Sequence, residues 1–159
     1  MTDVEMINTL LKKTDEEVFE AIEALQELDE TVLNIDKLWD GLHFWLTKAT
    51  ASEPLEGNPL SEAIVGVKNF SDGEDADIIA YILPESVPII INELRLFDIE
   101  NAIEEFQPKE FAQNGIYPNI WMNVGKEVMQ EELKECFWEL IKFYEKAAEV
   151  KKAVIVSIY

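Results

Sequence analysis

The chain has 159 residues, 48% of them hydrophobic and 29% charged, a balance typical of one globular domain rather than of a disordered chain. Against 13 Lys and Arg stand 33 Asp and Glu, which gives a formal net charge of −20. Nucleic acids and anionic membranes are bound through clustered Lys and Arg, so this charge argues against both as partners. It favours cationic partners instead.

The cysteine count and the hydropathy pattern indicate a cellular compartment. Cys136 is the only cysteine, so no intrachain disulfide forms, as is typical of a reducing compartment. The chain does not open with a basic segment followed by an apolar one. Its apolar runs are far shorter than the roughly 20 residues that cross a bilayer. We therefore expect a cytoplasmic protein, with residues 1–159 forming a single domain.

The first third of the chain predicts two helices. Residues 3–30 carry apolar side chains at helical spacing, and Thr14 followed by Glu17 is a capping box. Residues 35–47 predict a second helix that is apolar almost all round, which is typical of a buried helix. Residues 49–59 contain Ser, Thr, Pro and Gly and predict a surface loop.

The remaining segments alternate between short strands and helices. Two β-branched runs, 63–67 and 77–83, predict strands separated by an acidic turn at 69–76. The elements expected after them are helices at about 84–97, 98–106 and 108–115, an irregular stretch at 116–125, a long helix at 126–150 and a strand at 153–158. This pattern predicts an α+β fold with a small mixed or antiparallel sheet covered by several helices, and a long C-terminal helix followed by a final core strand.

Several blocks of the sequence resemble one known family. The chain is similar to the YfbM-like bacterial proteins, catalogued as domain of unknown function 1877, at the stretches 35–47, 59–66, 83–87, 116–118 with Trp121, and the closing hydrophobic strand. The resemblance implies an α+β fold and a bacterial cytoplasmic protein, and it implies no reaction. Members of that family usually open with a short strand before the first helix. This chain starts almost directly at the helix, so we expect either that the sheet lacks this edge strand or that the sequence is shortened at its start. Either case would expose a neighbouring edge and favour pairing with a second chain.

His43 is the only histidine, and any histidine chemistry depends on it. Asp40 and Thr47 lie on the same helix face, where Asp40 would orient the imidazole as a general base. Because Leu42, Phe44 and Trp45 are apolar, we favour the alternative of a core histidine that hydrogen-bonds to the backbone. No serine or cysteine is assignable as its nucleophile.

We predict no metal or cofactor site. The acidic residues of the turn at 69–76 lack the glycine and glutamate positions of a calcium-binding helix–loop–helix, so we expect a solvated turn. Cys136 lies on the inward stripe of the long helix, where a cysteine behaves as a small apolar residue. The six glycines are scattered and form no phosphate-binding loop.

Aromatic residues mark the place where we would look for a pocket. Trp39, Tyr117 and Trp121 belong to residue types favoured in cores and at binding hot spots, and core packing is the interpretation we favour. If a pocket exists, we expect it where residues 116–121 approach the turn from Trp39 to His43. The candidate binding residues are therefore Trp39, Asp40, His43, Tyr117 and Trp121.

These observations favour a non-enzymatic protein that binds a basic protein partner, with an immunity or antitoxin-like role as one concrete form. The expected contact surface is the row of Glu16, Glu20, Glu23 and Glu27. The alternative is a small-ligand sensor or an enzyme with a pocket near His43, Asp40, Tyr117 and Trp121. We expect a monomer or a weak homodimer.

Overall fold

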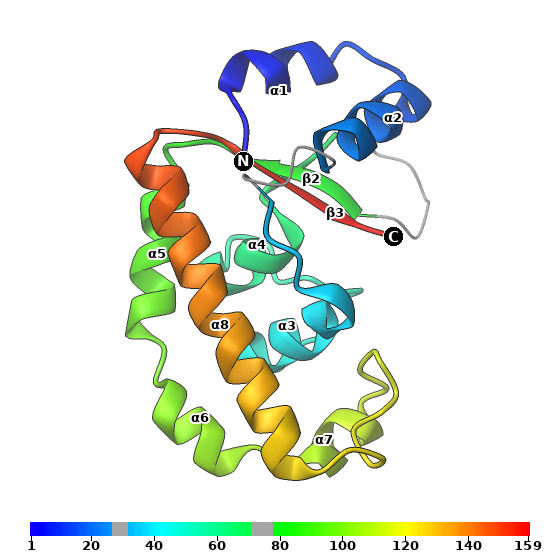
Figure 1. The fold of residues 1–159 in the computed structure, drawn as a ribbon, viewed down its shortest axis with the longest axis vertical. Helices are drawn as coiled ribbons and strands as arrows, with labels where there is room; N and C mark the ends of the chain where they lie inside the picture. Colours follow the sequence, from blue (N-terminus) through cyan, green and yellow to red (C-terminus); the bar gives the residue numbers. More distant parts are fainter. Residues whose placement is uncertain (27–31, 71–77) are drawn as a thin grey trace.

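A computed structural model describes residues 1–26, 32–70 and 78–159 of the chain. Within these ranges, eight α-helices, one short 3-10 helix and three strands follow one another (Figure 1). The elements are α1 (Val4–Leu10), α2 (Asp15–Gln26), η1 (Asp36–Leu38), α3 (Trp39–Thr47), α4 (Pro59–Val65), β1 (Lys68–Asn69), β2 (Ile78–Ile82), α5 (Val87–Leu96), α6 (Ile99–Glu105), α7 (Pro108–Gln113), α8 (Lys126–Glu149) and β3 (Val154–Ile158). This is the predicted α+β fold.

The three strands form one antiparallel sheet in the order β1-β2-β3. The central strand β2 pairs along its whole length with β3, so that Ala80 lies opposite Val156. The predictions of strands at 77–83 and 153–158 are confirmed. Only two residues of β1 join the sheet, and the predicted acidic turn that follows lies largely outside the described residues.

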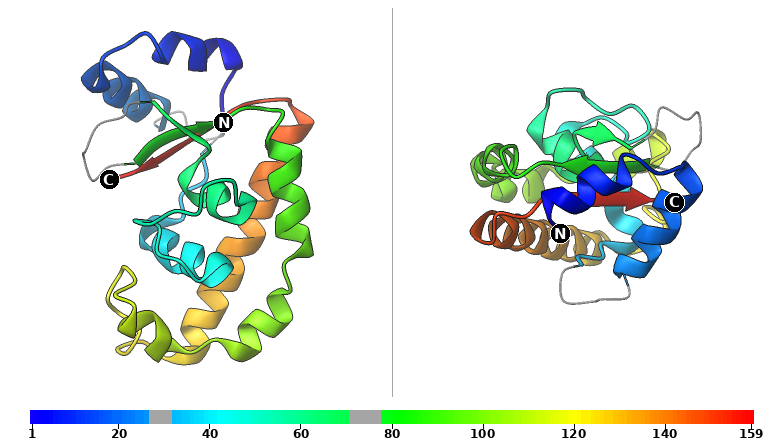
Figure 2. Two further views of the ribbon diagram at one scale, coloured as in Figure 1. Left: turned by 180° about the vertical axis from the view of Figure 1, so that it is seen from behind. Right: turned by 90° about the horizontal axis from the view of Figure 1, so that it is seen from above.

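Helices cover both faces of the sheet. In Figures 1 and 2, α1 and α2 lie on one side of β2 and β3, and α3, α4 and α8 lie on the other. The alternation of β3 side chains accounts for this arrangement. Ile155 packs against the cluster of α1 and α2, whereas Val154 and Val156 belong to the main core with α3 and α8.

The long helix α8 forms one wall of the main core. Leu133, Phe137, Leu140 and Tyr144 recur at helical spacing and are buried, as the sequence pattern predicts. They pack against α3 and α5, which the chain places beside α8 (Figure 1). In the described ranges, no helix combines the length and the apolar character needed to cross a membrane.

The prediction of a strand at 63–67 is wrong, because this segment is the second half of helix α4 and the turn after it. Asn58 caps the helix by accepting hydrogen bonds from two first-turn amides, and Pro59 occupies the first helical position. Gly66 ends the helix with a φ of 82°, and a Cβ there would come within 2.5 Å of the Ala80 side chain. A short apolar run fits a buried helix as well as a strand, so the capping residues decide.

The single helix predicted over residues 3–30 is two helices. The capping box is present, since the Thr14 amide donates to Glu17 Oε2 at 3.0 Å and the Glu17 amide donates to Thr14 Oγ1 at 3.4 Å. It begins the new helix α2 after a turn at 11–14 rather than lying inside one long helix. The turn lets α1 and α2 both place apolar residues on the sheet.

Candidate functional site

Residues 116–121 lie against the start of α3, at the place where we would look for a pocket. The Tyr117 amide donates a hydrogen bond to Asp40 Oδ2 at 2.9 Å, and the Tyr117 ring stacks on Trp39 with the ring centroids 5.7 Å apart. The ring of Trp121 packs directly on Gly41, where a Cβ would lie 2.4 Å from the indole. Four of the five candidate residues therefore come together around the first turn of α3.

Trp121 is a core residue. It is 1% exposed, its indole N–H donates to the Ile116 carbonyl at 2.7 Å, and its ring lies 4.6 Å from that of Phe111. A buried indole with its one donor satisfied stabilises the fold and is not accessible to a ligand. Its role here is to hold the 116–121 segment against α3.

Three polar side chains are buried among the described residues and have the same structural role: Asp40, His43 and Ser61. Each of them bonds to the backbone of the loop between α3 and α4. Such bonds satisfy backbone groups that a buried loop would otherwise leave unpaired. The bonds are Asp40 Oδ1 to the Ala51 amide at 2.8 Å, His43 Nδ1 to the Ala49 carbonyl at 2.8 Å and Ser61 Oγ to the Leu55 amide at 3.0 Å.

The hydrogen bonds of His43 define its tautomer. Nδ1 donates its proton to the Ala49 carbonyl, so Nε2 accepts from the Ser61 hydroxyl, 2.7 Å away. Burial lowers the pKa of His43 below its ordinary value, although the Ala49 carbonyl and the charge of Asp40 act in the opposite direction. The ring is therefore neutral at neutral pH, and it is 0% exposed. This Ser–His pair has no carboxylate on Nδ1 and no access for a substrate, so the geometry is that of a core histidine.

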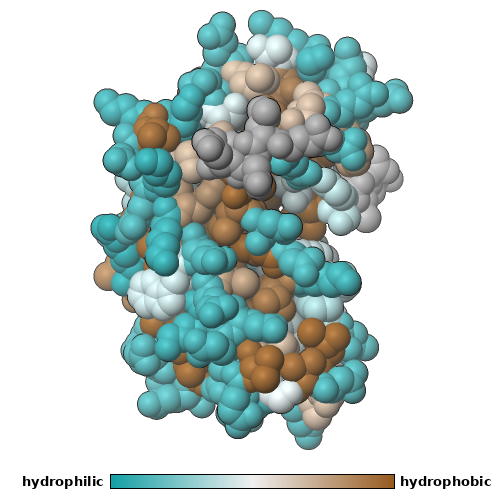
Figure 3. All heavy atoms as spheres, viewed as in Figure 1, coloured by the Kyte–Doolittle hydropathy of each residue, from teal (hydrophilic) through white to brown (hydrophobic). Residues whose placement is uncertain are grey.

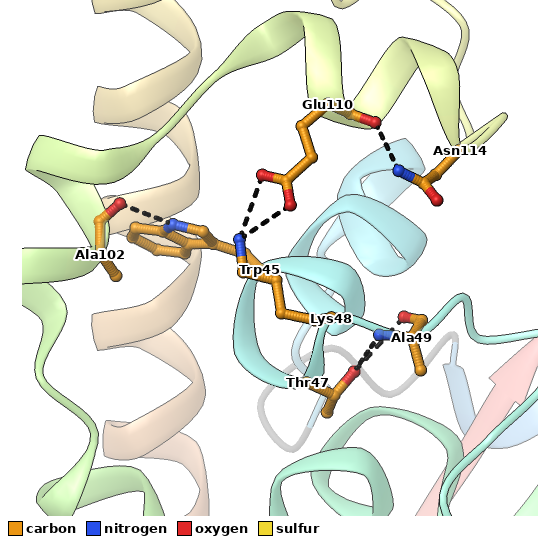
Figure 4. Close-up of polar contacts among 7 residues, drawn as sticks. All are labelled: Trp45, Thr47, Lys48, Ala49, Ala102, Glu110 and Asn114. Atoms are coloured by element: carbon orange, nitrogen blue, oxygen red, sulfur yellow. Dashed lines mark hydrogen bonds and ion pairs between the residues drawn. The ribbon is translucent and has the colours of Figure 1, made fainter.

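Further contacts hold the C-terminal end of α3 (Figure 4). The Trp45 indole donates to the Ala102 carbonyl of α6 at 3.2 Å, and the Lys48 ammonium lies 3.2 Å from the Glu110 carboxylate of α7. Both ends of α3 thus contact neighbouring segments, the first turn through Asp40 and the last through Trp45 and Lys48.

A cleft of about 960 Å³ begins at the Trp39–Tyr117 pair and extends along β3. We call it the β3 cleft. Its lining includes the 32–37 segment, residues 154–159, and side chains of α2 and α8. Figure 3 shows hydrophobic residues gathered at the middle of this face. Of the five candidate residues, Trp39 and Tyr117 line the β3 cleft, whereas Asp40, His43 and Trp121 do not.

Ser61 and the residues of β3 that line the cleft are not among the sequence-predicted candidates. Ser61 lies on helix α4, where the sequence predicts a strand at 63–67, although Asn58 followed by Pro59 is a helix-start signal. No local sequence pattern indicates that β3 lines a cleft, because an apolar strand has the same sequence pattern whether its outer edge is paired or open.

No group of three or more His, Cys, Asp or Glu side chains suited to a metal ion occurs in the described ranges. The acidic residues 72, 74, 75 and 77 fall outside them. Cys136 is partly buried on α8, and burial, with the charges of Glu139, Glu132 and Glu135, raises its pKa to about 11. Its thiol is therefore protonated at neutral pH and is a poor nucleophile.

Comparison with known proteins identifies relatives. The family model "Domain of unknown function (DUF1877)" matches residues 2–157. Protein YfbM of Escherichia coli (strain K12) is 31% identical over 122 residues, which are 74% of this chain and 70% of that protein. The crystal structure of YfbM from Escherichia coli, a protein of unknown function, superposes with a TM-score of 0.72 and 23% identity over 99% of this chain and 95% of that one. The chain belongs to the DUF1877 family of proteins of unknown function.

Proposed function

We propose that this protein is a non-enzymatic binding module that engages a basic protein partner through its acidic surface, for example in an immunity or antitoxin-like role. The observation that carries the proposal is a row of exposed carboxylates without compensating cations. Glu16, Glu20 and Glu23 are exposed on α2, three to four residues apart. None of them pairs with a cation in the described part of the chain. Glu27, the fourth member expected from the sequence, lies outside the described residues.

A second row of exposed carboxylates lies on α8, so the acidic surface is not confined to α2. Glu131, Glu135 and Glu139 are exposed at spacings of four residues. Fields of this sign attract cationic proteins and raise their association rates, with a strong dependence on salt. The net charge of −20 and these two rows favour a basic partner over an acidic one.

Neutralising the α2 row tests the proposal. The variant Glu16→Gln/Glu20→Gln/Glu23→Gln is compared with Glu131→Gln/Glu135→Gln/Glu139→Gln, which removes the same charge from α8. A basic protein is captured from the lysate of the native host at low salt and released at high salt, and its affinity for each variant is measured. We expect the α2 variant to lose at least about tenfold in affinity and the α8 variant much less. Equal affinities of both variants and the unmodified protein would exclude the α2 row.

The second candidate function is recognition of a small planar ligand at the Trp39 end of the β3 cleft. Trp39 and Tyr117 are stacked, Tyr117 is 44% exposed, and both line the cleft. Aromatic faces beside a cleft are common at ligand sites. A thermal-shift screen with metabolites tests it, because a ligand that binds only the folded state raises the melting temperature. Tyr117→Ala abolishes that rise, and Trp138→Ala, which removes an exposed aromatic outside the cleft, leaves it intact.

A further inference from the structure

The outer edge of β3 carries backbone groups without a described partner. The Val67 and Phe70 amides donate to the carbonyls of Tyr81 and Ile79, so these two residues of β2 face β1. By the alternation of an antiparallel ladder, Ala80 bonds to β3 at its partner Val156. Residues of β3 with the opposite parity, Ile155 and Ser157, therefore point their N–H and C=O groups away from the sheet. No hydrogen bond from these groups to another described residue is present.

On this edge of β3, the described residues form one antiparallel bridge next to the start of the strand. Thr2 and Ala153 exchange two hydrogen bonds of 2.8 Å each in an antiparallel bridge, and Ala153 has the same parity as Ile155 and Ser157. From Thr2 the chain proceeds past Lys152 into α1, away from β3. A segment that continued this register in the opposite direction would lie opposite Ile155 and then Ser157.

The β3 cleft runs along this edge. All six residues from 154 to 159 line it. Side chains of a strand alternate between the two faces of the sheet, so a cleft on one face would be lined by every second residue only. A cleft that all six residues line therefore lies along the edge of the strand. Apolar side chains form both walls: Ile22 and Leu25 of α2 on one side, Leu140 and Phe143 of α8 on the other. A strand added at the usual spacing of about 4.8 Å would lie between these walls.

We propose that the β3 cleft binds an extended segment of a protein partner, which adds to the sheet as a fourth strand antiparallel to β3. Apolar walls on both sides select a run of β-branched residues whose two faces are both apolar. The charge of −20 selects basic residues at the ends of that run. For this charge preference the proposal rests on the function proposed above, whereas the strand addition does not.

A second copy of this chain fits the edge less well than a single strand. Each copy carries the same charge of −20, so self-association brings like charges together. The β3 edge also lies between the walls from α2 and α8, so a second β3 would bring its own walls against them. The occupant is therefore a strand that leaves its own fold, or a disordered segment.

Amide hydrogen exchange of the full chain, followed by NMR, tests the pairing directly. The probe is a synthetic peptide of Val, Ile and Thr flanked by lysines. Without it, the amides of Val154 and Val156 are protected and those of Ile155 and Ser157 exchange fast. At a peptide concentration of about ten times its Kd, exchange at Ile155 and Ser157 slows about tenfold. Protection of these two amides in the free protein at every concentration, protection that grows with protein concentration alone, or no binding at millimolar peptide would overturn the proposal.

Peptide controls separate the strand from the charge. A peptide N-methylated at the amides that face β3 keeps every side chain and loses the backbone donors, and we expect its affinity to fall at least about tenfold. If it binds as well as the parent peptide, strand addition is wrong even though the charge preference stands. A peptide with serines in place of the lysines is expected to bind more weakly yet still protect Ile155 and Ser157. If it binds as well as the parent peptide, the charge preference fails and strand addition stands.

Two variants of the protein provide the matched test. Ser157→Pro removes the outward N–H of an edge strand, a position where proline leaves the ladder to β2 intact. Ser157→Ala removes the hydroxyl that accepts from Gln26 and keeps the N–H. We expect Ser157→Pro to lose peptide affinity at least about tenfold and Ser157→Ala to stay within about twofold. Equal affinities of the two folded variants contradict the proposed pairing, and if Ser157→Pro does not fold, the N-methylated peptide decides.

Discussion

At the scale of single residues, the first turn of α3 combines a tight packing contact with buried polar groups. Gly41 allows the Trp121 ring to lie on the helix backbone, and Asp40 holds the Tyr117 amide. His43, on the same helix, points to the loop that follows. These polar groups are all hydrogen-bonded. Removing one of them would leave its buried partner unsatisfied, which lowers the free energy of unfolding by more than the net contribution of the bond itself.

Gly41→Ala should destabilise the protein although it places a better helix former inside a helix. Alanine would contribute up to about 1 kcal/mol through helix propensity, but its Cβ would lie 2.4 Å from the Trp121 ring. We expect a net loss of about 1–3 kcal/mol in the free energy of unfolding, measured by urea denaturation. Gly125→Ala is the control, because a Cβ there makes only ordinary contacts of 3.8 Å and 3.9 Å. A stabilised Gly41→Ala would show that the ring does not pack on this position.

His43 should make the stability depend on pH. Burial lowers the pKa of the folded-state imidazole, so between that value and the ordinary value of about 6.5 only the unfolded state binds the proton. The contribution of neutral His43 is fully present above about pH 6.5 and falls by at most about 1.4 kcal/mol per pH unit below it. The difference in unfolding free energy between the unmodified protein and His43→Gln should therefore shrink as the pH falls from about 7.5 to about 5. A constant difference would mean that His43 does not titrate with unfolding.

At the scale of elements, one buried hydrogen bond joins α8 to α4. The Tyr144 hydroxyl donates to the Ala63 carbonyl at 2.7 Å, and burial raises the pKa of Tyr144 above its ordinary range, so the hydroxyl remains a donor. Ala63 lies in the last turn of α4, where the Val67 amide turns to Tyr81 instead of continuing the helix. The tyrosine thus satisfies a helix-end carbonyl that has no intrahelical partner.

Tyr144→Phe should cost about 1–3 kcal/mol, since it leaves this buried carbonyl unsatisfied with little change in packing. Tyr159→Phe removes a hydroxyl whose partner Gln26 lies at the surface, and it should change stability by less than about 0.5 kcal/mol. Chemical denaturation of both variants provides the measurement. Equal effects would mean that the α4–α8 bond contributes no more than a solvated one.

At the scale of the whole molecule, the net charge of −20 is the feature that bears on stability. This net charge is spread along the chain, with rows of exposed carboxylates on α2 and α8 among its parts, and the ion pairs of the described residues join side chains that are mostly well exposed. Exposed pairs of this kind contribute little to stability. Repulsion among the remaining carboxylates therefore opposes folding at low ionic strength.

The melting temperature should consequently rise between low and physiological salt, because the screening length falls to about 10 Å at 0.1 M. The measurement is a thermal melt monitored by circular dichroism in sodium chloride, with sodium sulfate at equal ionic strength as a control for ion-specific effects. A flat or falling response would mean that the carboxylates are dispersed enough, or paired well enough, to leave no net repulsion.

Local patterns in the sequence suffice for much of this protein. The helical spacing on α8, the capping box at Thr14 and the strands β2 and β3 follow from side-chain periodicity and hydrogen-bonding residues within a few positions of one another. The blocks that resemble YfbM-like proteins led to the family that the comparisons established.

Only the tertiary structure decided the rest. The segment at 63–67 carries both a β-branched run and the local helix-start signal of Asn58 and Pro59, and only the tertiary structure shows its contacts with Ala80 and Tyr144. His43 faces the 49–55 loop instead of Tyr117, because its direction depends on where that loop closes. The hydrophobic effect is non-directional, so the apolar pattern of a sequence indicates which residues are buried but not which residues they pack against. Which edge of a sheet stays open, and which aromatic residues meet at a cleft, follows from long-range packing that no local pattern contains.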